Sequence, residues 1–328
     1  MISQSRTHES NARISVIIPA YNAGNFIARA LASIERQTCI PYEVVVVDDG
    51  STDDTHLKIM EFAKMSKLNL IVKRQENHGS ATARNNGIRL SSGELITFLD
   101  ADDLIYPAFL EQATTGLSRY PHWVACFSDR DVVDSHGRLL AKDLDHPKFQ
   151  AISKKHMGAG FIELADDALF SKILAGSVIP MTIVCRRSAI SAVRGFDETL
   201  RFHEDRLLLL ELIRQGGTFG YTTDSLGIWQ RHEGNKTGAA NSLRGIESSD
   251  LILKKILDDR TKWNLSPQEL VDLQSARKRL ASSWIYAASH GGSVTTFSLG
   301  RRLLGERRIT LGCFLKAAAR YVVVSARR

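Results

Sequence analysis

The stretch "YEVVVVDDGSTDDT", Tyr42 to Thr55, decides the fold. Four consecutive valines lead into a pair of aspartates, and a turn of Gly, Ser and Thr follows. Valine suits a pleated strand because its Cβ is branched, and an unbroken apolar run is typical of a strand that is buried on both faces. The stretch therefore predicts an interior strand of a parallel sheet that ends in two carboxylates, Asp48 and Asp49.

Apolar runs alternate with helical patterns on both sides of this strand. Strand–helix–strand order at this spacing favours an α/β fold, with a mostly parallel central sheet and helices on both faces. The other expected strands are 14–18, "LNLIVKRQ" at 68–75 and "ELITFLDADD" at 94–103, and the expected helices are 26–36, 54–67 and 81–90.

Length and composition suggest one large domain with an addition. The chain has 328 residues, of which 43% are hydrophobic, so it can bury a sizeable core. We expect a flexible N-terminus over 1–12 and one domain over 13–240, in which strands become shorter after about residue 121. The region 241–328 is expected to be helical and basic, with helices at 246–262, 267–288 and 310–325.

No stretch reaches the roughly 18 uninterrupted apolar residues that suggest a membrane span. The first dozen residues lack the apolar segment of a secretory signal. Four widely separated cysteines predict neither a disulfide framework nor a zinc site. We therefore expect a cytoplasmic, reduced protein.

The net charge of +7 is concentrated at the C-terminus. Residues 301–328 contain eight Lys or Arg and one acid, so the rest of the chain is balanced. This region is either a docking helix with solvated arginines or a helix that lies on the membrane surface. Binding of nucleic acid is not expected, because basic residues are not interleaved with aromatic ones.

Acidic residues gather where predicted strands end. In parallel sheets ligands bind beyond the carboxyl ends of the strands, so Asp48, Asp49 and the "DADD" at 100–103 are expected on one rim. Carboxylates at this spacing repel each other unless a cation lies among them, and they can hold a divalent metal. A solvated turn that caps the next helix explains the same motif.

Three further motifs are ambiguous when each is taken alone. "NHGSATARNNGI" at 77–88 places Arg84 on a helix, where it either binds phosphate or is simply solvated. "GFDETLRFHED" at 195–205 offers either a general base or a helix cap. "WQRHEGNKTG" at 229–238 contains His232, which either completes a metal or phosphate site or has no function.

Taken in order, these motifs resemble the family 2 glycosyltransferases, an inverting group with the nucleotide-sugar-binding GT-A fold. The resemblance begins with "SVIIPAYNAGNFIARALASIERQT" and covers about 13–236. It implies a nucleotide pocket in which Asp49 accepts a hydrogen bond from uracil, Asp48 fixes the turn or the ribose side, and Arg84 lies near the base or diphosphate. It also implies that the end of the first strand shapes this pocket, through Pro19, Ala20 and Tyr21.

The resemblance also implies roles on the sugar and acceptor sides. Asp100 would face the ribose or sugar, and Asp102 would hold Mg²⁺ or Mn²⁺ between the phosphates, with His232 as a further contact to metal or phosphate. Asp205 would be the catalytic base, and Glu204 would support it or touch the acceptor. Two departures affect these contacts: the family often has Arg where Gln230 stands, and its pattern does not fix His203.

The implied activity is transfer of one sugar from a UDP-sugar to a hydroxyl of a lipid-linked saccharide acceptor. The implied setting is synthesis of cell-surface polysaccharide, such as exopolysaccharide or lipopolysaccharide, with peripheral contact at the inner membrane. A dinucleotide oxidoreductase is disfavoured because "PAYNAGNF" has one glycine. A nucleotidyltransferase that makes sugar nucleotides would need a Gly-rich basic loop there. A non-catalytic carbohydrate- or nucleotide-sugar-binding protein should have lost Asp102 or Asp205, and both are present.

Overall fold

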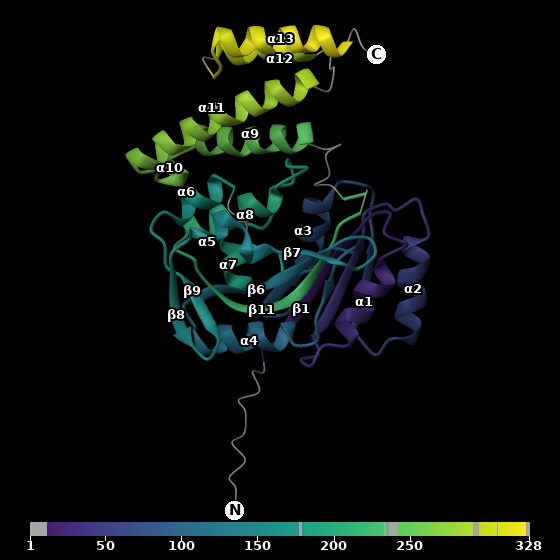
Figure 1. The fold of residues 1–328 in the computed structure, drawn as a ribbon. Coiled ribbons are helices and arrows are strands. Elements are labelled where there is room, and N and C mark those ends of the chain that lie inside the picture. Colours follow the sequence, from purple (N-terminus) through teal and green to yellow (C-terminus); the bar gives the residue numbers. More distant parts are fainter. Residues whose placement is uncertain are drawn as a thin grey trace, which may run out of the picture. The chain divides into compact units, whose positions relative to one another are not determined.

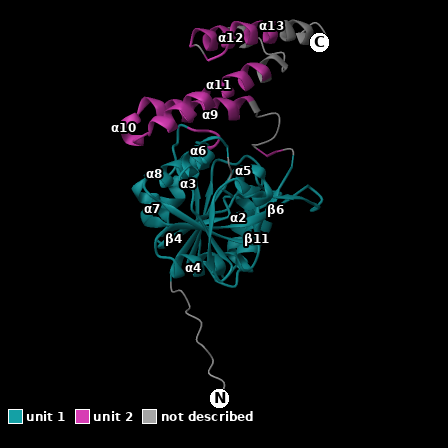
Figure 2. Ribbon diagram, turned by 60° about the vertical axis from the view of Figure 1, so that its left-hand side comes forward, with its two compact units in different colours: residues 1–199, 204–232 teal, residues 200–203, 233–328 magenta. Residues whose placement is uncertain are grey.

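The computed structural model describes residues 12–176, 179–232, 234–235, 242–290, 295–306 and 308–325. Its contacts divide the chain into two compact units, shown in Figure 2. Unit 1 comprises 1–199 and 204–232, and unit 2 comprises 200–203 and 233–328. Apart from Ala12, the predicted flexible N-terminus lies outside the described residues. The domain boundary expected at residue 240 stays a prediction.

The N-terminal half of unit 1 is a parallel sheet in the order β3-β2-β1-β4 (Figure 1). All six residues of β2 are buried, as the four valines predict. Because every pair is parallel, the strands end at the same edge. These strands are β1 (Ile14–Ala20), β2 (Glu43–Asp48), β3 (Leu70–Arg74) and β4 (Leu95–Phe98), and they alternate with α1 (Ile27–Glu35), α2 (Thr55–Met65) and α3 (Ser80–Leu90).

The rest of the sheet is mixed. β10 (Ile183–Arg186) lies antiparallel between β4 and β6 (Trp123–Val133), and β6 pairs in parallel with β11 (Thr218–Gln230). β11 then pairs with β9 (Phe161–Leu164), which pairs with β8 (Lys154–Gly158). The short strands β5 (Leu104–Ile105) and β7 (Leu139–Lys142) pair with β11 and β6, respectively.

The expectation that strands shorten after residue 121 is wrong. β6 has 11 residues and β11 has 13, whereas β2 has six. Polar residues interrupt the apolar run of β6, and the pairing of β11 with β6 contains register shifts that break the alternation. The helices of this part are α4 (Phe109–Arg119), the 3₁₀ helix η1 (Asp143–Asp145), α5 (Pro147–Gln150), α6 (Leu169–Leu174), α7 (Arg187–Ala192) and α8 (Glu204–Arg214).

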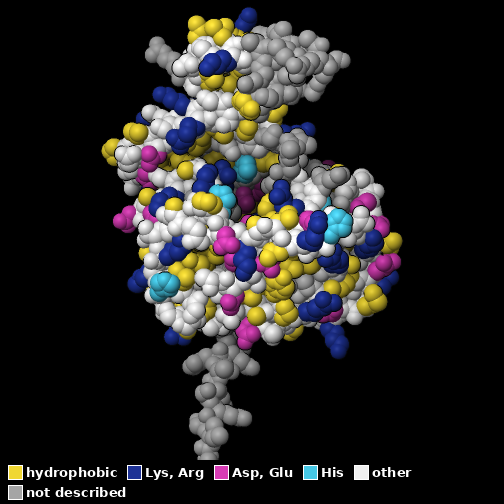
Figure 3. Space-filling view, in the orientation of Figure 1, with side chains coloured by type: hydrophobic (Ala, Val, Ile, Leu, Met, Phe, Trp, Pro, Cys, Tyr) yellow, Lys and Arg dark blue, Asp and Glu magenta, His cyan; other side chains and the backbone are white. Residues whose placement is uncertain are grey.

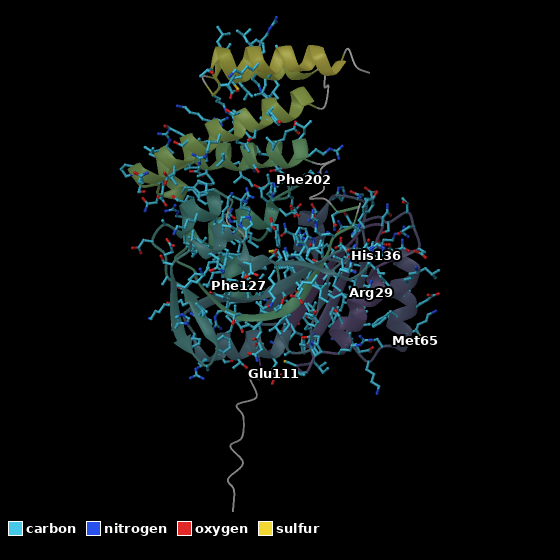
Figure 4. All side chains as sticks on the ribbon, viewed as in Figure 1. Arg29, Met65, Glu111, Phe127, His136 and Phe202 are labelled. Atoms are coloured by element: carbon cyan, nitrogen blue, oxygen red, sulfur yellow. The ribbon has the colours of Figure 1, made fainter. Side chains whose placement is uncertain are left out.

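Aromatic side chains fill the core beside the long strands. Phe127 on β6 is 1% exposed and stacks on Tyr221 of β11, with ring centroids 5.0 Å apart. Figure 4 places Phe127 in the interior and Met65, at the end of α2, on the outside. The long strands therefore carry the second half of the core.

Unit 2 contains helices around a small apolar core that includes Ile285 and Leu303. The predicted helix at 246–262 is two helices, and α12 lies where none was predicted. Among the described residues, no helix combines the length and the apolar character needed to cross a membrane. The helices are α9 (Ser242–Asp258), α10 (Arg260–Trp263), α11 (Pro267–His290), α12 (Thr295–Gly305) and α13 (Leu311–Ser325).

We expect Gly87→Ala to destabilise unit 1. A Cβ at Gly87 on α3 would lie 2.3 Å from Cγ2 of Ile17, which is fully buried in β1. Overpacking of this kind costs about 1–3 kcal/mol, and it outweighs the better helix propensity of alanine. Calorimetric unfolding measures the change, with Gly312→Ala on α13 as the control, because its Cβ would meet only Thr310 Oγ1 at 4.0 Å. An unchanged unfolding temperature for Gly87→Ala would contradict this packing.

Candidate active site

The parallel strands β1, β2 and β4 bring their carboxyl ends to one edge of the sheet (Figure 1). Ala20 and Asp48 are paired in register at the ends of β1 and β2, and the amide of Asp49 donates to the carbonyl of Ala20 at 2.8 Å. Asp100 follows the end of β4 by two residues. The edge therefore collects the acidic residues that the sequence places after strands.

The loop after β1 is held by the turn after β2. The amide of Asn22 donates to Ser51 Oγ at 3.1 Å, and Asn22 Oδ1 accepts from the amide of Thr52 at 2.8 Å. These contacts hold Asn22 at a φ of 49°, in the left-handed region that asparagine tolerates. Before it, Pro19 is half-buried, Ala20 is buried and Tyr21 is 51% exposed. Their contribution to a nucleotide pocket stays a prediction.

The carboxylate of Asp48 is fully buried beneath this turn. Its Oδ1 accepts from the amide of Ser51 at 2.9 Å, and its Oδ2 lies 3.3 Å from Nε of Arg74 and 3.2 Å from Nδ1 of His56. Of the two roles considered for Asp48, these contacts favour fixing the turn.

Asp49 is 3% exposed and accepts three hydrogen bonds from the segment that leads into α3. They come from the side chain of Gln75 at 2.7 Å, the amide of His78 at 2.9 Å and the amide of Gly79 at 2.8 Å. Asp49 thus positions the start of α3. The predicted contact of Asp49 with uracil stays a prediction.

Arg84 joins two distant acids. Its Nη2 donates to Asp100 Oδ1 at 2.6 Å, and its Nη1 donates to Glu204 Oε1 at 2.7 Å. Burial alone would lower the pKa of Arg84, but the charges of Asp100 and Glu204 raise that pKa above its ordinary value. This ion-pair network connects α3, the end of β4 and the start of α8.

The acids of "DADD" form a cluster in which ligand oxygens of Asp100, Asp102 and Asp103 lie within 4.8 Å of one another. Asp102 Oδ2 lies 3.0 Å from Nε2 of His232, whose ring stacks on Phe26 at 4.5 Å. Burial and the charge of Asp100 raise the pKa of Asp102. A divalent cation fits this set, since it prefers oxygen ligands and would relieve their repulsion.

Asp103 differs from the other two acids. It is 8% exposed, accepts from the amide of Gln230 at 3.2 Å and lies 3.8 Å from Nη1 of Arg130. The "DADD" motif alone predicts no separate role for Asp103. Through Gln230 it holds the end of β11, two residues before His232, and so places the imidazole beside Asp102.

Asp205 lies in the first turn of α8, directly after Glu204. It is half-buried, and its Oδ1 accepts from the amide of Arg206 at 2.7 Å. The structure therefore joins Arg84, Asp100, Glu204 and Asp205 through contacts and chain continuity, and it joins Asp102 to His232. Tyr21 and Asp49 are connected to these acids through the shared edge of the sheet.

Ser80 and Phe26 were not predicted as site residues. Ser80 Oγ donates to Glu204 Oε1 at 2.5 Å, and Phe26 supports His232. Ser80 lies in the quoted "NHGSATARNNGI" motif, four positions before Arg84, so helical periodicity places both on one face. Nothing in the local sequence around Phe26 indicates that its ring meets residue 232.

Asp103→Asn should stabilise the unliganded chain at neutral pH. Burial raises the pKa of Asp103 well above its ordinary value, with Arg130 opposing the shift and Asp102 adding to it. The neutral form therefore stabilises the fold below the unfolded-state pKa of about 3.9, and this stability is lost as pH rises through the folded-state pKa. The variant should gain stability over wild type as pH rises, and unfolding temperatures measured from acid to neutral pH check this.

The control is Asp103→Ala, which also removes the acceptor of the Gln230 amide. A buried donor without a partner costs about 1–3 kcal/mol, so Asp103→Ala should lack the gain in stability that is expected for Asp103→Asn. If Asp103→Asn destabilised the chain at neutral pH, this result would contradict the buried environment that raises the pKa of Asp103.

The chain is similar to known proteins in sequence and in fold. Residues 15–169 match the model of the family described as glycosyl transferase family 2. An uncharacterized glycosyltransferase of Rickettsia bellii is 30% identical over 202 residues, covering 62% of this chain and 26% of the relative. The chain spans about a quarter to a third of the length of the first curated relatives it matches, with shares of 26%, 32% and 30%.

Solved structures share the fold. Staphylococcus aureus TarS 1–349 in complex with UDP-GlcNAc has a TM-score of 0.62 at 21% identity, covering 95% of this chain and 89% of that one. The mannosyltransferase PcManGT from Pyrobaculum calidifontis, in complex with GDP-Man and Mn²⁺, has a TM-score of 0.60 at 19% identity, covering 97% and 87%. Residues 15–169 are thus similar to glycosyl transferase family 2, and the chain shares the GT-A fold of these solved glycosyltransferases.

Proposed function

We propose that the chain is an inverting glycosyltransferase that moves one sugar from a UDP-sugar to a hydroxyl of a lipid-linked saccharide acceptor. The acceptor would be a growing cell-surface polysaccharide, such as exopolysaccharide or lipopolysaccharide. The observation that carries the proposal is the linkage of Asp102, Asp100, Arg84 and Glu204–Asp205 at one edge of the sheet. Donor-side acids and a candidate base therefore lie in one network.

Asp205 is the proposed general base. The acceptor oxygen attacks the anomeric carbon as its proton passes to Asp205, and the bond from that carbon to UDP breaks with its electron pair leaving on UDP. A single displacement inverts the configuration. The hydrogen bond from the Arg206 amide to Oδ1 fixes the Asp205 side chain, so that Oδ2 is the oxygen proposed to receive the proton.

Asp102 is the residue proposed to hold Mg²⁺ or Mn²⁺, with His232 beside it. Asp100 and Asp103 are already engaged, by Arg84 and by Gln230 with Arg130, respectively. When bound, the cation supplies positive charge that stabilises the leaving diphosphate. His232, which contacts Phe26 and Asp102, would bind the same phosphates or the metal.

The nucleotide of the donor is a separate part of the proposal. The structural neighbours named above were solved with UDP-GlcNAc and with GDP-Man, so the fold itself accepts either base. The resemblance of the "VDDGS" motif favours UDP. A panel of UDP- and GDP-sugars, assayed for release of nucleotide with and without Mn²⁺, tests both choices.

Two substitutions should separate the donor role from the base role. Asp205→Asn should lower transfer about 10²–10⁴-fold, the usual contribution of a general base, and leave UDP affinity largely intact. Asp102→Ala should abolish transfer and also greatly weaken UDP binding in the presence of Mn²⁺. Transfer rates and calorimetric titration of UDP measure these effects. Equal loss of UDP affinity in both variants would contradict the separate roles, and binding without turnover by the wild type would favour a non-catalytic binding protein.

The proposed membrane contact uses unit 2. Arg301 and Arg302 on α12 and Lys316 on α13 are exposed, and Leu311 and Leu315 on α13 are each 57% exposed. Figure 3 shows basic and apolar side chains together on the drawn face of this unit. Basic residues near anionic lipid contribute about 1 kcal/mol each, and apolar side chains add to the binding. This combination suits a surface that lies on anionic lipid.

Reversal of the three basic charges should release the chain from anionic vesicles. Changing Arg301, Arg302 and Lys316 to Glu should lower partitioning onto phosphatidylserine-containing vesicles by about 100-fold or more, given ~1 kcal/mol per residue. Vesicle sedimentation measures this.

The matched control reverses Lys64, Lys67 and Lys73 in unit 1, which changes the net charge equally. Equal loss of vesicle binding in both variants would reject a local membrane surface.

A further inference from the structure

Arg84 bonds to two carboxylates inside the protein. The residue is 6% exposed, its two terminal nitrogens donate to Asp100 and Glu204, and its guanidinium lies 5.3 Å from the ring centroid of Phe196. The family resemblance implies a place near the base or diphosphate instead. Because its two terminal nitrogens each bond to a carboxylate, the guanidinium is oriented by the protein itself, while its Nε is buried and has no hydrogen-bond partner among the described residues.

Glu204 is held equally firmly. Its Oε1 accepts from Arg84 at 2.7 Å and from Ser80 Oγ at 2.5 Å, and the residue is 6% exposed. Ser80 and Arg84 both lie on α3, whereas Glu204 is the first residue of α8. The start of α8 is therefore fastened to α3 at two points by one buried carboxylate.

We infer that Arg84 and Glu204 are positioning residues that set the place of Asp205 relative to the donor-side acids. The inference rests on the proposed function and assigns Glu204 one of the two roles that the resemblance leaves open. Glu204 fixes the first turn of α8, and Asp205 is its covalent neighbour. Arg84 connects the same turn to Asp100, which precedes Asp102 by two residues. Displacement of a reacting group by about 1 Å can cost 10²-fold in rate, so such a link bears directly on transfer.

Glu204 is unsuited to carry the proton itself. Its Oε1 already accepts hydrogen bonds from the Arg84 guanidinium and the Ser80 hydroxyl, so this oxygen is committed to contacts inside the protein. Asp205 is half-buried, and its Oδ1 accepts from a backbone amide. The two adjacent acids thus have different roles: Glu204 is bonded to α3, and Asp205 is the proposed base.

Substitutions at Glu204 test the assignment. Glutamine keeps a side-chain oxygen that can accept from Arg84 and Ser80, whereas alanine keeps none. Glu204→Gln should therefore retain at least about a tenth of wild-type kcat, and Glu204→Ala should lose about 10²-fold in kcat with little change in KM for the UDP-sugar. The pH–rate profile of Glu204→Gln should keep an acidic limb, because Asp205 remains the base.

Arg84→Lys provides the second arm. The single ammonium of lysine keeps the charge but cannot bond to Asp100 and Glu204 with two separate nitrogens. We therefore expect kcat to fall about 10–100-fold, while the Kd for UDP changes less than about threefold. Ser80→Ala removes one of the two fastenings and should lower kcat by a few-fold only. Circular dichroism and thermal unfolding of each variant show that it is folded.

Two outcomes would overturn the inference. One is a folded Glu204→Gln as inactive as Glu204→Ala, which would make the charge of Glu204 part of the chemistry. The other is an Arg84→Lys that loses UDP affinity more than 10-fold while keeping its kcat, which would place Arg84 on the nucleotide. A wild-type chain that turns over no nucleotide sugar would instead overturn the proposed function, so the two failures are distinguishable.

Discussion

The site depends on the ion pairs that the buried guanidinium of Arg84 forms with Asp100 and Glu204. Transfer of an ion from water into a protein interior costs several kcal/mol, and this cost is offset only by partners of good geometry. Arg84 has two such partners, Asp100 at 2.6 Å and Glu204 at 2.7 Å. They lie 16 and 120 residues away from Arg84 in the sequence. Without its charge, the buried carboxylate of Glu204 would lose this ion pair. The guanidinium thus allows negative charges from separate elements to share one edge of the sheet.

The cluster of acids shows that the free chain is not built for stability at this point. Burial and mutual repulsion raise the pKa of both Asp102 and Asp103, which means that their ionised forms destabilise the unliganded fold. Proteins tolerate such costs where function requires them. The rigid parallel strands beneath the cluster, with every residue of β2 buried, hold these groups together in spite of the repulsion.

The sequence was most informative where a local pattern carries the structure. The run of valines before Asp48 predicted a strand buried on both faces, and the order of strands and helices predicted the α/β fold. It was less informative for β6, where Asp129 and Asp131 interrupt the apolar pattern. Both acids find partners elsewhere: Asp129 accepts from the amide of Leu144 at 3.0 Å, and Asp131 accepts from Ser225 Oγ at 2.5 Å. The local sequence does not indicate that these carboxylates accept hydrogen bonds from groups farther along the chain.

The candidate site was likewise predictable from the sequence only in part. Its acids could be named from motifs, but neighbours as similar as Asp102 and Asp103 differ only through contacts with His232 and Arg130, which tertiary structure supplies. The partners of Asp49 were equally hidden, since a strand-end carboxylate can face a ligand or a loop. The sequence states which side chain stands at each position, but the direction in which that side chain points depends on the elements that pack beside it.

The inward orientation of Glu204 also limits how this chain can vary. Successive residues of an α-helix are separated by about 100° around the axis, because a turn contains 3.6 residues. With Glu204 locked against α3, the angular position of every later side chain on α8 is set by its count from that residue. Insertion or deletion of a single residue at this point would turn the neighbouring acid by more than a quarter of a revolution. A change of chain length at the start of α8 would therefore reorient Asp205, whereas a substitution there leaves this rotation unchanged.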